Sequence, residues 1–355
     1  MTRSRQSRAW PRRVRGVTLV ELMVGLAIGL FLVGVGSLIF LGSKGTFQSQ
    51  NHVGRLQESA RFVADTINAD LRMAGFRGCR GFGATTPLTN TLNTPTGFLY
   101  NFAQGVWASR SSGSAWSPAL DAALTSRVPA PTPAGDVLTI RRALGPGWAL
   151  TAEMVSATAV LNVSAGSLIR RGDLLMVSDC GGAAVLQATN ATPGADGSIE
   201  HSTAVALTPG VSAASLGRPF LQDALVHRLV TSSYYIAASA RTGKTDQRAL
   251  WVHTTPSYDG TTYPQELVTG VERMAVRLGL DSNGDGGVEA YVTPDQVTDW
   301  AVVSAVQIDL LLASTENFVT TEPQPYLWNG ARITPTDRRQ RTVVSLTASV
   351  RNATR

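Results

Sequence analysis

Hydrophobic and polar positions divide the N-terminal part of the chain into three stretches. Residues 1–16 contain six arginines and no acid, residues 17–42 are apolar except for Glu21, and residues 43–76 mix both kinds of position. An apolar run of about 20 residues, rising about 1.5 Å per residue, crosses a bilayer as a helix. The basic flank predicts a cytoplasmic N-terminus. We therefore expect a single membrane-spanning helix with the rest of the chain outside the cytoplasm.

The third stretch predicts that this helix continues beyond the membrane. Its apolar residues recur at three- and four-residue steps, which places them in one stripe along a helix. They are Val53, Leu56, Ala60, Val63, Ile67, Leu71 and Ala74. The pattern ends at Gly75 and Gly78, as helices commonly do. We expect one helix of about 55 residues whose second half packs on a separate domain.

Short apolar runs separated by turn residues predict that residues 77–355 form a β-rich extracytoplasmic head. The expected strands are Asp136–Arg141, Leu174–Ser178, Ala184–Thr189, Thr203–Leu207, Leu225–Ala237, Ala249–Thr254, Glu266–Arg277, Val302–Leu312 and Thr342–Arg351. Residues 79–135 predict long ordered loops. Their aromatic side chains either fasten the loops to the core or form a contact surface. The fold class is α+β, with a long helix packed on a β-rich head.

Glu21 needs a partner, because an ionised carboxylate near the membrane costs about 2.5–3.5 kcal/mol on the more lenient insertion scales. No Lys or Arg lies near it on the apolar side of the sequence. Cleavage of the chain after Gly16 would free the amine of Val17. That amine could neutralise Glu21 within the same chain or in a neighbouring subunit.

Gly16, the following Val-Thr-Leu-Val-Glu and the long apolar helix together resemble the class III signal of type IV prepilins and pseudopilins. The resemblance implies that a prepilin peptidase cuts between Gly16 and Val17 and methylates the new N-terminus, and that Glu21 acts in assembly. This family usually has Phe where the chain has Val17. An uncleaved signal anchor is the alternative. A secretory signal would need a small-residue cleavage site after a shorter apolar core.

The last third of the chain, from a valine-rich strand through an aspartate loop to a final strand ending in Arg-Asn, resembles the PilW family of minor pilins. Cys79 and Cys180 are the only cysteines. Outside the cytoplasm two thiols usually form one disulfide, and their positions resemble that family too. Two buried free thiols are the alternative. The resemblance does not cover residues 85–165.

The aspartate loop has the start of an EF-hand-type calcium loop, with side-chain oxygens at alternate positions and Gly286 at the sharp turn. The candidate Ca²⁺ ligands are Asp281, Asn283, Asp285, the carbonyl of Gly287, and Glu289. Val292 stands at the twelfth place, where a bidentate Glu belongs, and Asp295 is a conceivable substitute. The predicted dissociation constant is therefore about 10⁻⁴–10⁻³ M. The alternative is a metal-free turn.

Charge and motifs exclude several functions. The formal net charge is +6, but the leader holds six of the 31 Lys and Arg residues, so the remaining 25 match the 25 acids. A chain without a basic excess does not indicate nucleic-acid binding. The four histidines are scattered, and no nucleophile elbow or phosphate loop is present. We do not expect an enzyme.

These features together predict a minor pilin that assembles with other minor pilins and the major pilin. The large head favours a priming role at the pilus tip, supporting adhesion or twitching motility. A J-type pseudopilin of a type II secretion system is the nearest alternative. Two others are an adhesin module that uses Phe82–Trp116 as its contact surface and a membrane-anchored hydrolase.

Overall fold

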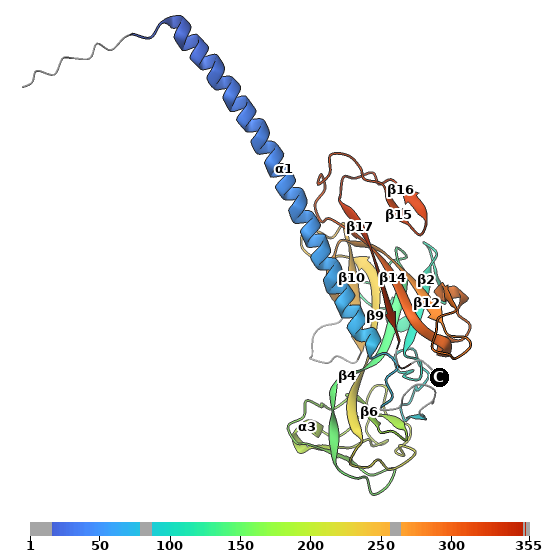
Figure 1. Ribbon diagram of the computed structural model, residues 1–355. Helices are drawn as coiled ribbons and strands as arrows, with labels where there is room; N and C mark the ends of the chain where they lie inside the picture. The colour runs from blue at the N-terminus through green and yellow to red at the C-terminus, as the bar shows by residue number, and fades with distance from the viewer. Residues whose placement is uncertain (1–15, 79–86, 256–263, 351, 353–355) are drawn as a thin grey trace, which may run out of the picture. The chain divides into compact units, whose positions relative to one another are not determined.

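The computed structural model describes residues 16–78, 87–255, 264–350 and 352 of the chain (Figure 1). The chain divides into two compact units, residues 1–52 and 53–355. One helix, α1 (Leu19–Arg72), runs through both units and is 54 residues long. The strands all follow it in the sequence. This arrangement confirms the predicted α+β class, a long N-terminal helix followed by a β-rich head.

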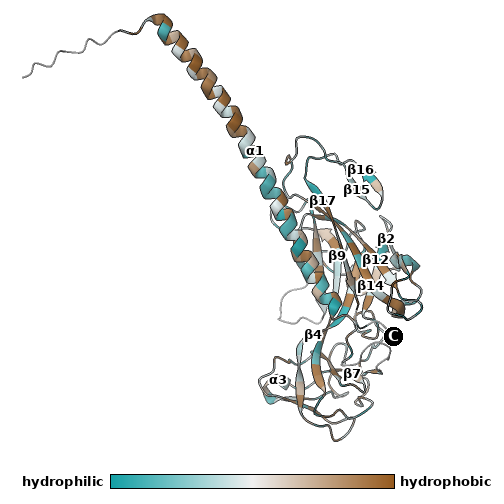
Figure 2. Ribbon diagram, viewed as in Figure 1, coloured by the Kyte–Doolittle hydropathy of each residue, from teal (hydrophilic) through white to brown (hydrophobic). Residues whose placement is uncertain are grey.

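The two halves of α1 differ in character, as the sequence predicts. The first half is almost uniformly hydrophobic and the second half is mixed (Figure 2). In the second half the buried apolar residues are Leu56, Ala60, Val63, Ile67 and Leu71. The predicted stripe is thus confirmed for these five positions. The helix ends at Arg72, and Gly75 follows with a φ of 65°, in the left-handed region that favours glycine.

The larger sheet of the head has eleven strands. Its main path runs through β1 (Leu88–Asn90), β7 (Ala183–Gln187), β6 (Leu174–Ser178), β9 (Leu225–Ala238), β4 (Val137–Ala152), β2 (Val106–Ser111) and β3 (Trp116–Ser117). Off this path lie β10 (Arg248–Thr255), β11 (Gln265–Thr269), β5 (Leu161–Val163) and β8 (Ser198–Ile199). β9 pairs with β4, β6 and β10, and all of its residues except the first and last are buried.

The smaller sheet has the order β13 (Ala290–Val292), β12 (Val271–Leu280), β14 (Val303–Ala313) and β17 (Arg341–Ser349), with antiparallel neighbours. β15 (Tyr326–Trp328) and β16 (Ala331–Ile333) form a separate two-stranded sheet. The short helices are α2 (Ala122–Thr125), α3 (Pro193–Asp196), η1 (Pro294–Gln296) and η2 (Trp300–Val302). β14 is buried along most of its length, as a central strand is expected to be.

The main hydrophobic core joins α1 to both sheets. Its members come from the stripe of α1, from β4, β9 and β10 of the larger sheet, and from β12, β14 and β17 of the smaller sheet. Val63 and Ile67 are fully buried in this core. Each buried side chain of this size contributes about 1.5–3 kcal/mol, so the stripe is a major source of the head's stability.

A buried polar group also fastens α1 to the larger sheet. Asp70 Oδ2 accepts a hydrogen bond from Tyr234 Oη at 2.7 Å, and Asp70 Oδ1 lies 2.8 Å from Arg142 Nε. Burial and the Asp70 carboxylate hold the pKa of Tyr234 well above its usual value. The tyrosine hydroxyl therefore remains a donor to Asp70. The sequence pattern gave no sign of this network, because Asp70 is not one of the apolar residues of the stripe.

The loop region after α1 contains more regular structure than predicted, namely β1, β2, β3 and α2. Buried Arg141 fastens this region, because its guanidinium donates to the carbonyls of Phe98 and Gln104. Burial lowers the pKa of Arg141 to about 10, which leaves it charged at neutral pH. Phe98 and Phe102 pack on hydrophobic clusters. The aromatic residues named here thus fasten loops to the core.

Two further differences from the sequence prediction concern single segments. Thr203–Leu207 is not a strand but a turn and irregular chain, so that prediction is wrong. Beyond β17, Asn352 Nδ2 donates to the carbonyls of Arg72 at 3.4 Å and Ala74 at 3.1 Å. Asn352 thereby satisfies backbone carbonyls at the C-terminal end of α1, which have no partner within the helix.

Candidate assembly segment and metal site

The N-terminal assembly segment begins at Gly16 and Val17, which are exposed and directly precede α1. Thr18 caps the helix, because its Oγ1 accepts a hydrogen bond from the Glu21 backbone N–H at 3.2 Å. The capped start places Glu21 in the first turn, where the helix dipole favours a negative charge. The side chain of Glu21 is exposed and forms no ion pair within the part of the chain that the structure describes.

The side chains of the apolar half of α1 are not buried against other residues of the unit formed by residues 1–52. Apolar side chains from Leu19 to Phe47 are largely exposed, and Leu19 has an exposed fraction of 74%. Among the described residues α1 is the one helix long and apolar enough to cross a membrane. A Cβ atom added at Gly25 or Gly29 would meet no atom within 4 Å. Packing within the chain therefore does not explain these glycines.

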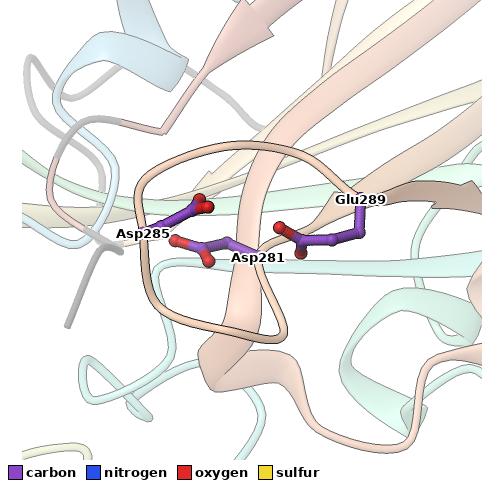
Figure 3. A group of neighbouring side chains, drawn as sticks. All are labelled: Asp281, Asp285 and Glu289. Carbon is purple, nitrogen blue, oxygen red and sulfur yellow. The ribbon is translucent and has the colours of Figure 1, made fainter.

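The aspartate loop connects β12 to β13, and three of its carboxylates converge (Figure 3). One oxygen from each of Asp281, Asp285 and Glu289 lies within 4.8 Å of the others. Asp281 is buried, whereas Asp285 and Glu289 are exposed. Three carboxylates so close together repel one another, and a cation would relieve this repulsion.

Hydrogen bonds within the loop hold these carboxylates in place. Asp281 accepts from the backbone N–H groups of Gly284 at 2.7 Å and Gly286 at 3.0 Å. Glu289 accepts from the Ser282 N–H at 2.7 Å, and Asp285 Oδ1 accepts from the Gly287 N–H at 2.7 Å. The hydrogen bond between Ser282 and Glu289 was not predicted from the sequence. The one signal for it was the position of Ser282 directly after the first aspartate of the loop.

The two other predicted ligands, Asn283 and Gly287, would supply an amide oxygen and a backbone carbonyl instead of a carboxylate. Asn283 lies within the loop, but its Nδ2 donates to Asp285 Oδ2 at 3.0 Å and its Oδ1 accepts from the Asp285 N–H at 2.8 Å. Gly287 contributes a backbone N–H to Asp285. A metal at this position would therefore bind chiefly to carboxylate oxygens, with the Asn283 and Gly287 oxygens as secondary ligands.

The structure gives no support for Asp295 as a substitute twelfth ligand. Asp295 lies in η1 and forms an ion pair with Arg110 at 3.1 Å. Hydrogen bonding from Thr293 is the main cause that lowers the pKa of Asp295, and the Arg110 contact acts in the same direction. Val292, which occupies the twelfth place, pairs with Leu278 in the β12–β13 ladder. The loop is thus a hairpin connection without the second helix of an EF-hand.

The predicted disulfide stays a prediction. Cys180 is exposed in the turn after β6, and Cys79 lies outside the described residues. The neighbouring residues are close together, since a Cβ atom added at Gly78 would stand 3.0 Å from the Asp179 carbonyl and 3.1 Å from Ser178 Cβ. The chain just before the first cysteine therefore lies against the chain just before the second.

Comparisons with known families match the two ends of the chain. Residues 11–37 match the prokaryotic N-terminal methylation motif. This match and the capped apolar helix are typical of prepilin-like proteins. Residues 233–352, which include β12, β14 and β17, match the family described as type IV pilus-assembly protein W. These two segments, at opposite ends of the chain, are the ones that a PilW-family type IV minor pilin would match. No curated protein and no solved structure shows significant similarity to it.

Proposed function

We propose that the chain is inserted in the inner membrane with its N-terminus in the cytoplasm, cut between Gly16 and Val17 by a prepilin peptidase, methylated, and then built into a type IV pilus. The main observation behind this proposal is that the apolar half of α1 is exposed. The N-terminal end of this helix is capped by Thr18 and is also exposed. Such a surface is stable in lipid before assembly and among the helices of neighbouring subunits afterwards.

The mechanism is assembly rather than catalysis. The apolar half of α1 leaves the bilayer and packs against the same half of adjacent subunits, and Gly25 and Gly29 allow close approach of helices. Glu21 pairs with the amine of Val17, which neutralises both charges and sets the axial register of the subunit. The exposed position of Glu21 supports this role, because its carboxylate is available to a partner.

The size of the head supports a tip position in the filament as part of this proposal. The unit from residue 53 to residue 355 contains all three sheets, and such a head favours the tip or priming complex over a repeating position in the shaft. The partners there are other minor pilins and the major pilin. In this role the chain supports adhesion or twitching motility.

Intact-mass measurement of the protein from its native envelope tests the processing step. We expect a chain that begins at Val17 with one added methyl group. Gly16→Leu should leave the leader attached, because a bulky side chain blocks access to the scissile bond, whereas Arg8→Leu should still be processed. A native protein that begins upstream of Val17 would contradict the proposal.

A deletion strain separates the pilus from the secretion alternative. A J-type pseudopilin of a type II secretion system has the same kind of processed N-terminus, so the prepilin motif alone does not distinguish the two. Loss of surface pili and of twitching with normal secretion supports the pilus role. Loss of secretion with normal pili supports the pseudopilin. Cross-linking that finds many copies along the shaft would contradict the tip position.

The second part of the proposal is a weak calcium site in the aspartate loop. Three convergent carboxylates held by loop N–H groups support it. Oxygen ligands and negative charge are what Ca²⁺ requires, and an incomplete ligand set gives a dissociation constant of about 10⁻⁴–10⁻³ M. Bound calcium would fasten the β12–β13 hairpin at the edge of the smaller sheet.

Calorimetry and thermal melting of the full chain in detergent test the calcium site. With a dissociation constant of about 1 mM, about 10 mM Ca²⁺ should stabilise the head by about 1.4 kcal/mol relative to chelator. Asp285→Asn should abolish this gain, because Asp285 is exposed and its loss removes a ligand charge without opening the core. Asp246→Asn, also exposed, serves as the control. No binding heat and no melting shift at millimolar calcium would remove the site.

A further inference from the structure

A pocket of about 580 Å³ lies in the head where β2, β10 and β12 meet. Four arginines line it, Arg110 from β2, Arg248 from β10, and Arg273 and Arg277 from β12. The pocket volume falls within the range of about 300–1,000 Å³ that is usual for small-ligand sites. Its lining is mostly polar, which distinguishes it from the apolar pockets that bind hydrophobic ligands.

The alternation of β12 explains the shape of this pocket. Arg273, Ala275 and Arg277 lie on one face of the strand, and Met274 and Val276 are buried in the main core on the other face. The small side chain of Ala275 leaves space between the two arginines. Arg273 and Arg277 therefore flank Ala275 on the same face of β12 and both line the pocket, so both side chains are available to an anion bound over Ala275.

The charges of the pocket are not balanced by the protein. Arg110 pairs with Asp295, but Arg248, Arg273 and Arg277 form no salt bridge with any described residue. Arg248 donates one long hydrogen bond, 3.4 Å, to the Glu272 carbonyl. Arg341, by contrast, pairs with Glu272 and Asp337. Three arginines without acidic partners in one concavity indicate a ligand with negative charge.

Asp136 also lines the pocket, but its carboxylate does not pair with the three arginines that lack a salt bridge. Its two oxygens accept the backbone N–H groups of Ser111 and Val276, each at 2.8 Å. Its own N–H donates to the Met274 carbonyl at 2.9 Å, so Asp136 braces β2 against β12. Burial raises the pKa of Asp136 to about 6. The carboxylate is thus committed to the fold and leaves the outer arginines without a counter-ion.

We propose that this pocket binds an anionic saccharide of about two rings through carboxylate or sulfate groups held by Arg273 and Arg277. The planar guanidinium binds both kinds of oxyanion with two parallel hydrogen bonds. Asn329 at the rim has a side-chain amide that makes no hydrogen bond to a described residue and is available to sugar hydroxyls. The inference goes beyond the assembly role and does not depend on it.

Two other ligand classes fit the pocket less well. A nucleic acid is gripped by an extended basic face that follows its backbone, whereas these arginines converge on one concavity and the processed chain is formally neutral. A peptide anchored by hydrophobic side chains would need apolar subpockets, and the lining is mostly polar. A ligand that is rich in hydroxyls and carries an acid group suits the observed surface.

Isothermal titration calorimetry of the full chain in non-ionic detergent tests the inference with three disaccharides, digalacturonate, lactose 3′-sulfate and neutral lactose. We expect binding of at least one anionic sugar, with affinity falling as salt rises, and no binding of lactose. The carboxylate and sulfate arms show which acid group the pocket prefers. The R273Q/R277Q variant should weaken binding by about tenfold or more, because charge-assisted hydrogen bonds are lost.

The matched control is R55Q/R171Q, which removes two exposed arginines outside the pocket and should bind as the parent does. Arg277→Gln alone changes one exposed residue of the pocket. This single variant replaces R273Q/R277Q in the binding test if the double variant does not fold. The proposal is overturned if both anionic sugars fail to bind at about 10 mM, if lactose binds equally well, or if the arginine variants bind like the parent. Tighter binding of a hexaglutamate peptide than of either sugar would assign the pocket to an acidic protein segment instead.

Discussion

Glu21→Ala is expected to lower incorporation of the chain into pili by about 100-fold while leaving membrane insertion and processing intact. Without Glu21, the amine of Val17 on the adjoining subunit has no counter-charge among apolar helices, at a cost of about 2.5–3.5 kcal/mol. The variant helix also carries no charge that opposes its residence in lipid, so extraction becomes less favourable. The amount of the variant in sheared pili, relative to the amount in the membrane, measures the effect.

Glu58→Ala is the matched control for this experiment, because it removes an exposed glutamate from the same helix outside the apolar half. Its incorporation should equal that of the parent. Glu21→Gln separates charge from size and should behave like Glu21→Ala. The Thr18 cap survives in each variant, since it uses the backbone N–H of residue 21. Efficient incorporation of Glu21→Ala would show that the charge pair does not drive assembly.

Asp70→Ala is expected to destabilise the head by about 3–5 kcal/mol, the usual cost of removing one partner from a buried ion pair. The variant removes the carboxylate that forms an ion pair with Arg142 at 2.8 Å, and it leaves Tyr234 Oη without the acceptor of its 2.7 Å hydrogen bond. Thermal melting of the full chain in detergent should show a fall on the order of 10 °C. The head would then lose part of the connection between α1 and the larger sheet.

Asp65→Ala on the same helix is the control, since its partner Arg61 is 3.7 Å away and both side chains are largely exposed. Such surface pairs contribute about 0–1 kcal/mol. The double variant Asp70→Ala/Arg142→Met should recover part of the lost stability, because it removes the charge that Asp70→Ala leaves buried. Equal melting temperatures for Asp70→Ala and Asp65→Ala would mean that the network contributes little.

The elements that could be predicted from the sequence are those in which the pattern of apolar residues matches the pattern of buried residues in the structure. The stripe of α1 and the buried runs of β9 and β14 were visible because apolar residues either recur at helical spacing or continue without interruption. β2 was missed because its short run of small and polar residues gives no clear alternation. Thr203–Leu207 alternates like a strand but finds no pairing partner in the structure, and pairing is not encoded in a local pattern.

The candidate sites differ in the same way. Contacts between residues close in sequence could be predicted, and contacts between residues far apart in sequence could not. The convergence of Asp281, Asp285 and Glu289 could be predicted, because all three lie within one loop. The pairing of Asp295 with Arg110 could not, since the two residues are 185 positions apart. The arginine pocket is of the second kind too, because three separate strands bring its side chains together.

The hydrogen bond from Asn352 to the end of α1 has a consequence for the order of events during folding. Asn352 and Arg72 are 280 positions apart, so this contact has a very high contact order. High contact order slows folding, because long loops must close before such contacts form. Helix α1 can therefore form well before the last strand arrives to complete the core. During that interval the apolar stripe of α1 lacks the cover that β17 supplies.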